Sequence, residues 1–82
     1  MPEITRFYGI TINMYFSEHN PPHFHAIYGE YSGEFNLSNL KMVKGNLPDK
    51  AQKLIIEWAR KYRKELLDMW DTKNFTHIKP LE

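Results

Sequence analysis

The clearest pattern in the chain is an alternation of hydrophobic and polar residues over residues 10–16. One side of this segment carries Ile10, Ile12, Met14 and Phe16, and the other carries Thr11, Asn13 and Tyr15. A period of two is typical of a β-strand that buries one of its faces. The pattern therefore predicts a strand, which can begin already at residues 6–9, with Gly9 at a bulge or bend.

Two further strands are predicted at residues 24–28 and 31–37, which form a hairpin. Gly29 and Glu30 between them match a two-residue hairpin turn, in which glycine is favoured at the first central position. The segment before the hairpin, residues 17–22, is predicted to be a loop, because its two prolines cannot donate backbone hydrogen bonds to a neighbouring strand. Residues 40–43 can add a short fourth strand.

A long amphipathic helix is predicted at about residues 48–71. Its hydrophobic stripe recurs at helical spacing and consists of Ala51, Leu54, Ile55, Trp58, Ala59, Tyr62, Leu66, Met69 and Trp70. Pro48 suits the first turn of a helix, and Asp49 places a negative charge at the positive end of the helix dipole. Residues 72–82 show no regular period, so we expect an irregular tail.

Together these elements predict an α+β fold in a single domain over residues 1–82, with its strands within residues 4–46. The sheet is expected to be antiparallel with three or four strands, and the C-terminal helix to pack on one of its faces. A domain of this size buries only about 60–65% of the surface of its unfolded chain, so it depends on a small core. That core is expected to be aromatic, because the chain has five Phe, five Tyr and two Trp.

Composition and charge exclude several classes of protein. The chain has no cysteine, which excludes disulfides and cysteine zinc sites and fits a reducing compartment. Its net charge of +1 gives no long-range field that would attract nucleic acid. No apolar run approaches the about 20 residues that span a bilayer, and the first residues lack the features of a signal peptide. We therefore expect a cytoplasmic protein without a membrane partner.

The predicted hairpin gathers histidines on one face. If Tyr28 pairs with Tyr31 across the turn, His25 lies opposite Glu34. Alternation then places His23 and His25 on the same face, about 6.6 Å apart along the strand. The opposite face, expected to lie under the helix, carries Phe24, Ala26, Tyr28, Tyr31, Gly33, Phe35 and Leu37. Both histidines are therefore expected to be exposed.

His23, His25 and Glu34 are candidate catalytic residues. Glu34 could orient His25 as a general acid and base while His23 carries a second proton, a combination that suits phosphodiester chemistry. The same three side chains, with His19 or Glu18 from the loop, could instead hold zinc or another transition metal. A third interpretation is purely structural, since His25 and Glu34 could form an ordinary cross-strand pair worth about 0.2–1 kcal/mol.

The surface of the predicted helix offers two further candidate sites. Lys61 and Lys64 lie in a cluster of basic residues that could contact the phosphates of RNA or DNA, although interspersed acidic residues are typical of a solvated helix face. Separately, Ile56 and Leu67 are eleven residues apart and fall on nearly the same side of the helix. Beside Arg60 and Arg63 they form a candidate protein interface, or they widen the buried stripe.

A set of short motifs extends over almost the whole chain. They are Arg6-Phe7-Tyr8-Gly9-Ile10, Met14-Tyr15, His19-Asn20-Pro21-Pro22-His23-Phe24-His25-Ala26, Tyr28-Gly29, Gly45-x-Leu47-Pro48, Ala51 and Glu57-Trp58. Together they resemble a bacterial family of domains of unknown function, family 4160, and the proline–histidine segment is the most specific of them. At position 27, where relatives commonly carry a charged residue, this chain has Ile27.

The resemblance implies a small prokaryotic cytoplasmic protein. Such proteins are often encoded beside another small domain of unknown function, in an arrangement similar to toxin–antitoxin pairs. The expected partner is therefore a small neighbour-encoded protein or a second copy of the chain. The resemblance carries no catalytic residues over to this sequence.

Two functional hypotheses follow. The first is a protein-binding component of a toxin–antitoxin-like, two-protein system. The second is a small histidine-dependent hydrolase or ribonuclease that uses His23, His25 and Glu34, either metal-free or metal-dependent.

Overall fold

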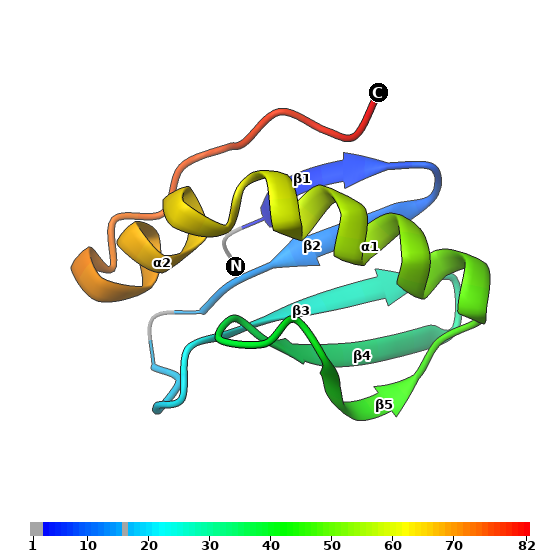
Figure 1. The fold of residues 1–82 in the computed structure, drawn as a ribbon, viewed down its shortest axis with the longest axis horizontal. Helices are drawn as coiled ribbons and strands as arrows, with labels where there is room; N and C mark the ends of the chain where they lie inside the picture. Colours follow the sequence, from blue (N-terminus) through cyan, green and yellow to red (C-terminus); the bar gives the residue numbers. More distant parts are fainter. Residues whose placement is uncertain (1–2, 16) are drawn as a thin grey trace.

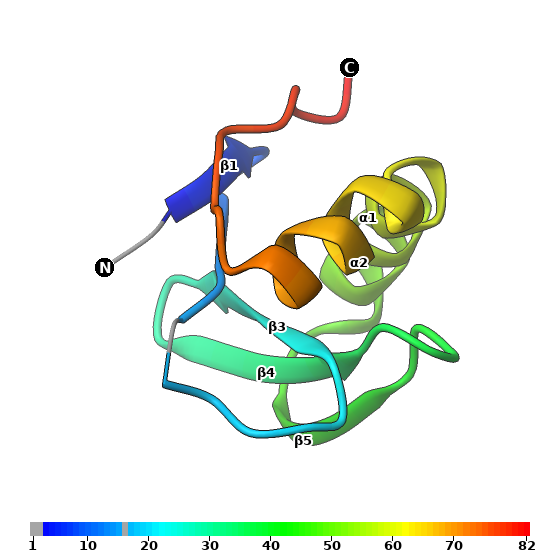
Figure 2. The same cartoon turned by 90° about the vertical axis from the view of Figure 1, so that its left-hand side faces the viewer.

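The chain folds into one antiparallel sheet with two helices on one side of it (Figures 1 and 2). The computed structural model describes residues 3–15 and 17–82. The elements in chain order are β1 (Glu3–Phe7), β2 (Ile10–Asn13), β3 (His23–Tyr28), β4 (Tyr31–Asn36), β5 (Met42–Asn46), α1 (Asp49–Lys61) and α2 (Arg63–Thr72). Each strand pairs with the next one along the chain, so the sheet order is β1-β2-β3-β4-β5. The α+β class is confirmed.

The sheet has five strands, and the prediction of three or four strands is wrong. The additional strand is β1, which was expected to be a lead-in to β2. Tyr8 and Gly9 both take positive φ angles, 49° and 80°, and this tight turn folds β1 back against β2. A bulge near the start of β1 interrupts its alternation, which is why the residue pattern did not reveal it. The predicted strand at residues 40–43 is β5 and starts two residues later.

The register of the central hairpin is confirmed. Tyr28 pairs with Tyr31, and His25 lies opposite Glu34. The expected core face is buried towards the helices, apart from the two tyrosines beside the turn, which are 37% and 38% exposed. They lie at the end of the hairpin, where burial is incomplete. The inward orientation expected for Phe16 falls outside the described residues.

The C-terminal helical region consists of two helices, and the prediction of a single long helix is wrong. The chain leaves helical geometry at Tyr62, which has φ −113° and ψ 20°. A straight helix over residues 48–71 would be about 36 Å long, whereas the longest dimension of the molecule is 31 Å. The break allows α2 to bury Leu66, Met69 and Trp70 instead of extending past the sheet. None of the described helices is long and apolar enough to cross a membrane.

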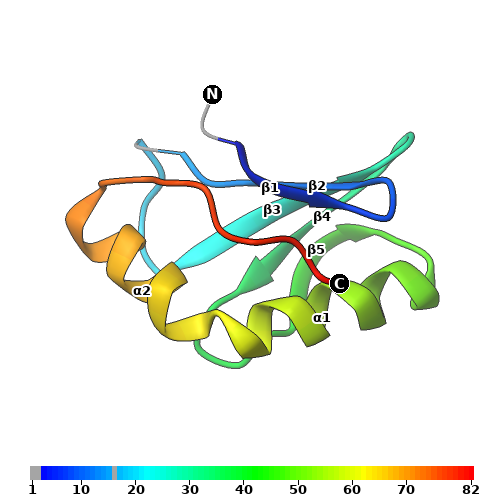
Figure 3. The same ribbon diagram turned by 90° about the horizontal axis from the view of Figure 1, so that it is seen from above.

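The C-terminal tail has no regular secondary structure after α2, as expected, but it is anchored (Figure 3). The backbone N–H of Ile78 donates to the carbonyl oxygen of Ile4 in β1, at 3.0 Å. The indole N–H of Trp58 in α1 donates to the carbonyl oxygen of Lys79, at 2.8 Å. The tail therefore connects the β1 edge of the sheet to α1.

Gly45 in β5 is a position where the fold requires glycine. Its φ is 114°, and a Cβ atom would lie 2.3 Å from the carbonyl oxygen of Ser32 and 2.5 Å from Cα of Gly33. We predict that Gly45→Ala lowers the free energy of unfolding by about 3 kcal/mol, from backbone strain and overpacking together. Urea denaturation followed by tryptophan fluorescence measures this loss.

Gly29 provides the matched control. Its φ is also positive, at 60°, but a Cβ atom there would meet nothing within 4 Å. Gly29→Ala should therefore cost only about 1 kcal/mol. Equal losses in the two variants would contradict the view that close approach of β4 and β5 requires Gly45.

Candidate functional site

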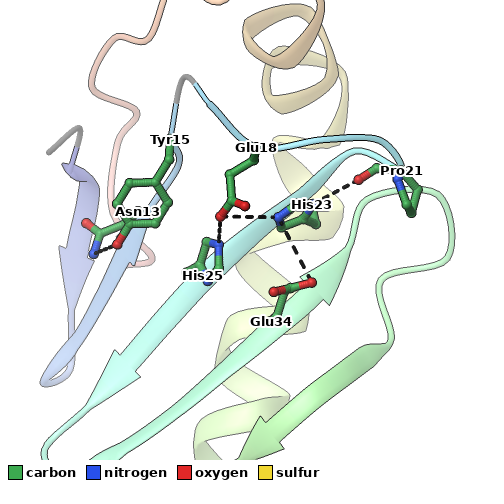
Figure 4. Close-up of polar contacts among 7 residues, drawn as sticks. All are labelled: Asn13, Tyr15, Glu18, Pro21, His23, His25 and Glu34. Carbon is green, nitrogen blue, oxygen red and sulfur yellow. Dashed lines mark hydrogen bonds and ion pairs between the residues drawn. The ribbon is translucent and has the colours of Figure 1, made fainter.

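The loop between β2 and β3 brings the side chain of Glu18 to the sheet. The indole N–H of Trp70 in α2 donates to the side-chain oxygen of Asn20, at 2.9 Å. At the other end of the loop, the backbone N–H of Leu37 donates to the carbonyl oxygen of Pro22, also at 2.9 Å. These two contacts hold the loop against α2 and the end of β4, and Glu18 then lies over the histidines of β3 (Figure 4).

Glu18, His23 and His25 form a compact group, here called the carboxylate–histidine cluster (Figure 4). Nε2 of His25 lies 2.5 Å from Oε1 of Glu18, and Nε2 of His23 lies 3.5 Å from the same oxygen. One nitrogen or oxygen atom from each residue lies within 4.8 Å of the others. The centroids of the two imidazole rings are 5.2 Å apart, which agrees with the prediction that both histidines share a face.

The predicted pairing of His25 with Glu34 is replaced by a different one. Glu34 lies opposite His25 in the strand register, but the ion-pair contact of its carboxylate is diagonal, with Oε2 4.0 Å from Nε2 of His23. His25 instead contacts Glu18. The loop was predicted to supply Glu18 only as an alternative metal ligand, so its contact with His25 is a finding of the structure.

His23 is buried, and the expectation that both histidines are exposed is wrong for it. Its side chain is 8% exposed, and its ring packs against the ring of Trp70 with centroids 5.0 Å apart. Nδ1 lies 2.8 Å from the carbonyl oxygen of Pro21. A carbonyl only accepts hydrogen bonds, so Nδ1 carries the proton of this contact. Nε2 is buried and has no hydrogen-bond partner among the described residues.

His25 is the accessible histidine of the cluster. Its side chain is 26% exposed and lines a cleft of about 430 Å³ together with Tyr15, Glu34 and Lys44. The ring of Tyr15 contacts the ring of His25 edge-on, with centroids 4.9 Å apart. A molecule in this cleft can therefore reach His25 and Glu34, but it cannot reach the buried Nε2 of His23 directly.

Asn13 is a member of the site that the sequence did not single out. It lies beside His25 in the register of β2 and β3, and it is completely buried. Its amide nitrogen donates to the hydroxyl of Tyr15 at 3.4 Å, while its Oδ1 has no hydrogen-bond partner in the described part of the chain. Alternation in β2 already placed Asn13 on the polar face, which was the available signal.

Other predicted site residues lie outside the cluster. His19 is exposed, and the structure does not bring it to Glu18, His23 and His25. Lys61 and Lys64 are exposed on the helices, away from the cleft that His25 lines. Contact with nucleic acid by these two lysines stays a prediction.

Of the four residues of the candidate interface on the helices, three contact other parts of the chain and one is exposed. Ile56 and Leu67 are partly buried and pack against the core. The guanidinium of Arg63 donates to the carbonyl oxygens of Leu37 and Ser38, at 2.9 and 2.5 Å. Arg60 is exposed. Arg63 thus fastens the loop after β4, and an interface at this surface stays a prediction.

Comparison with known proteins identifies one family. The profile of DUF4160, a domain of unknown function, matches residues 9–71. The matched segment contains the whole carboxylate–histidine cluster and Glu34. No curated protein and no solved structure matches the chain.

The environment of Glu18 predicts a pH-dependent stability. Its hydrogen bond to His25 is the main cause that lowers the pKa of the Glu18 carboxyl below the usual value of 4.5. Burial acts in the opposite direction, and the charge of His25 and the proximity of His23 lower this pKa further. A carboxylate with a lowered pKa stabilises the fold above its unfolded pKa, and this contribution is lost as the pH falls through the folded pKa. We predict that the wild-type protein loses stability more steeply than Glu18→Gln when the pH is lowered from about 5 to about 3.

Urea denaturation at a series of pH values measures this difference. Glu30→Gln at the exposed turn between β3 and β4 is the matched control and should follow the wild-type protein. Parallel pH profiles for wild-type protein and Glu18→Gln would show that the contact between Glu18 and His25 does not stabilise the fold.

Proposed function

This chain belongs to the DUF4160 family of domains of unknown function, and from its structure we propose that it is a small hydrolase that cleaves phosphodiester bonds in RNA. One observation carries the proposal. A carboxylate oxygen and two imidazole nitrogens converge within 4.8 Å, beside a cleft that His25 and Glu34 line. Cleavage of a phosphodiester needs a group that takes the proton of the nucleophile and a group that stabilises charge on the phosphate.

In this proposal the side chains have different roles, which their positions support. His25 and Glu34 line the cleft, so they are the groups that can touch a substrate or its attacking hydroxyl. Glu18 holds His25 through the 2.5 Å contact and thereby orients its ring. His23, whose Nε2 is buried, supports the cluster from behind and does not meet the substrate.

The lining of the cleft fits a single strand of RNA. Lys44 lies opposite Glu34 in the register of β4 and β5 and brings a positive charge into the cleft, where a phosphate would bind. Tyr15 lines the same cleft and offers an aromatic ring on which a base can stack. A cleft of about 430 Å³ accommodates a short segment of a strand and not a duplex. The lysines of the helices have no part in this proposal.

The proposal predicts cleavage of a fluorogenic single-stranded RNA by the purified protein. We expect His25→Ala and Glu34→Gln to lower kcat/KM by about 100-fold or more, the range for loss of a group that transfers protons. His77→Ala is the matched control, because His77 is exposed in the tail, and it should retain full activity.

Circular dichroism and thermal unfolding establish that each variant is folded before the comparison. Glu34→Gln is the more informative variant, since it preserves the size of the side chain. Two outcomes would contradict the proposal, namely no cleavage by the wild-type protein, or cleavage that persists unchanged in both His25→Ala and Glu34→Gln.

A second candidate function is binding of a small partner protein in a toxin–antitoxin-like, two-protein system. The observation that favours it is an apolar groove of about 600 Å³ whose lining includes Tyr8, Tyr28, Leu54 and Leu81. Tyr8 at its rim is 61% exposed. An exposed aromatic side chain beside an apolar groove is typical of a surface that a partner covers. The family resemblance adds a neighbour-encoded protein as the expected partner.

Size-exclusion chromatography with light scattering tests this candidate on the protein alone and with its neighbour-encoded protein. We predict a complex that Tyr8→Ser weakens at least 10-fold and that Arg60→Ala leaves unchanged, because truncation of an exposed aromatic anchor costs more than loss of a peripheral charge. If Arg60→Ala weakens the complex and Tyr8→Ser does not, the interface lies instead on the helix surface with Ile56 and Leu67. Failure of the wild-type proteins to associate would contradict this function.

A further inference from the structure

We propose that the carboxylate–histidine cluster binds one divalent transition-metal ion, with zinc as the best fit, through Nε2 of His23, Nε2 of His25 and Oε1 of Glu18. A role of this ion in RNA cleavage rests on the proposed function, whereas its binding does not. The proposal follows from three features of the cluster, namely the unpartnered nitrogen of His23, the spacing of the donor atoms and the open cleft.

The first feature is the orientation of His23. Its Nδ1–H is committed to the carbonyl oxygen of Pro21, at 2.8 Å. In the neutral ring Nε2 is then a bare acceptor. This acceptor faces the carboxylates of Glu18 and Glu34, at 3.5 and 4.0 Å, which are acceptors as well. Three acceptors that face one another attract a positively charged group.

Burial makes this arrangement more than a solvated acidic patch. The His23 side chain is 8% exposed, and its Nε2 has no hydrogen-bond partner among the described residues. An unpaired buried polar atom costs free energy, so native structures rarely leave one without a partner. A metal ion at Nε2 supplies that partner. The donation from Nδ1 to a backbone carbonyl is also the usual second contact of a metal-binding histidine, because it fixes the ring orientation.

The spacing of the donor atoms agrees with a tetrahedral ion. With metal–ligand distances of about 2.0–2.2 Å, donors in a tetrahedral zinc site lie about 3.3–3.6 Å apart. Nε2 of His23 and Oε1 of Glu18 are already 3.5 Å apart. The contact between Glu18 and His25 is shorter, at 2.5 Å, so the Glu18 side chain must retreat by about 1 Å when the ion replaces the shared proton. Glu18 can do so because it lies on a loop and is 32% exposed.

The donor set selects the class of metal. Two imidazoles and one carboxylate suit zinc and other transition metals, whereas magnesium and calcium prefer sites made entirely of oxygen atoms. The same set of two histidines and one glutamate occurs in catalytic zinc sites, which keep one position open for water. Here the open position would face the cleft that His25 and Glu34 line. An ion there can acidify a bound water or polarise a phosphate oxygen.

Titration of the chelator-treated protein with zinc chloride alone tests the proposal. We expect calorimetry to give one ion per chain, and thermal unfolding to shift upwards with the zinc concentration, because the ion binds the folded state. Magnesium chloride should give neither effect. Cobalt(II) should produce the visible absorption bands of a tetrahedral site with nitrogen and oxygen ligands.

Variants assign the binding to the cluster. His25→Ala and Glu18→Gln should each weaken zinc binding at least 100-fold, and His23→Ala should do so if the variant folds. His19→Ala and His77→Ala replace exposed histidines outside the cluster and should bind zinc like the wild-type protein. Absence of one-to-one binding, or binding that survives both His25→Ala and Glu18→Gln, would overturn the proposal.

Measuring zinc binding and RNA cleavage on the same protein preparation distinguishes failure of the metal site from failure of the proposed hydrolase. Zinc binding without RNA cleavage would remove the proposed function and leave the metal site in place. RNA cleavage by a wild-type protein that binds no zinc in the titration would overturn the metal site and leave the hydrolase in place.

Discussion

Trp58 occupies the point at which the separate parts of this small domain meet. Trp58 belongs to α1, and its side chain is completely buried. Its ring contacts Phe7 of β1 and Phe24 of β3. Its indole N–H donates to the carbonyl oxygen of Lys79 in the tail. One side chain thus connects the helix, two strands and the C-terminal segment. A domain with so small a core depends on such aromatic contacts, because each large ring buries about 150–250 Å².

The carboxylate–histidine cluster depends on a second tryptophan at the other end of the helical region. Trp70 packs on the ring of His23 and donates to Asn20, so α2 holds both the loop and the first histidine. This contact is possible because the helical region breaks at Tyr62 and does not run on as one straight helix. The break in the helix and the geometry of the cluster are therefore parts of one arrangement. Changes at α2 should affect the cluster even where they touch none of its polar atoms.

Burial gives the two histidines different chemical roles. His25 is open to the cleft and can meet a substrate, whereas Nε2 of His23 is shielded and can only serve a partner inside the cluster. Direct proton transfer to a substrate by both histidines is therefore incompatible with the structure. The proposed ion would reconcile the buried acceptor with the neighbouring carboxylates, and it would leave Glu34 free in the cleft. With an ion bound, Nε2 of His25 would be a ligand, and proton transfer would fall to Glu34 and a bound water; without an ion, His25 itself would be free to transfer protons. The hydrolase and the metal site are compatible with that division of roles, and each can fail alone.

The sequence by itself determined the features that depend on local geometry. Strand alternation and the two-residue turn predicted that His25 lies opposite Glu34 and that His23 shares its face, because pairing across a tight turn leaves little choice of register. The helical spacing of residues in α1 predicted the buried stripe around Trp58. These inferences need only neighbouring residues and the periods of the two regular structures.

Only the tertiary structure decided which side chains meet in the cluster. The burial of His23 depends on Trp70, and the orientation of His25 depends on Glu18, which reaches it from a separate loop. Trp70 is far from His23 in the sequence, and Glu18, although only seven residues from His25, reaches it through the path of an irregular loop. Neither contact follows from the period of a regular element. Likewise, β1 escaped prediction because its bulge interrupts the alternation. The break at Tyr62 escaped prediction because the buried stripe continues at helical spacing across it, from Trp58 and Ala59 to Leu66 and Met69.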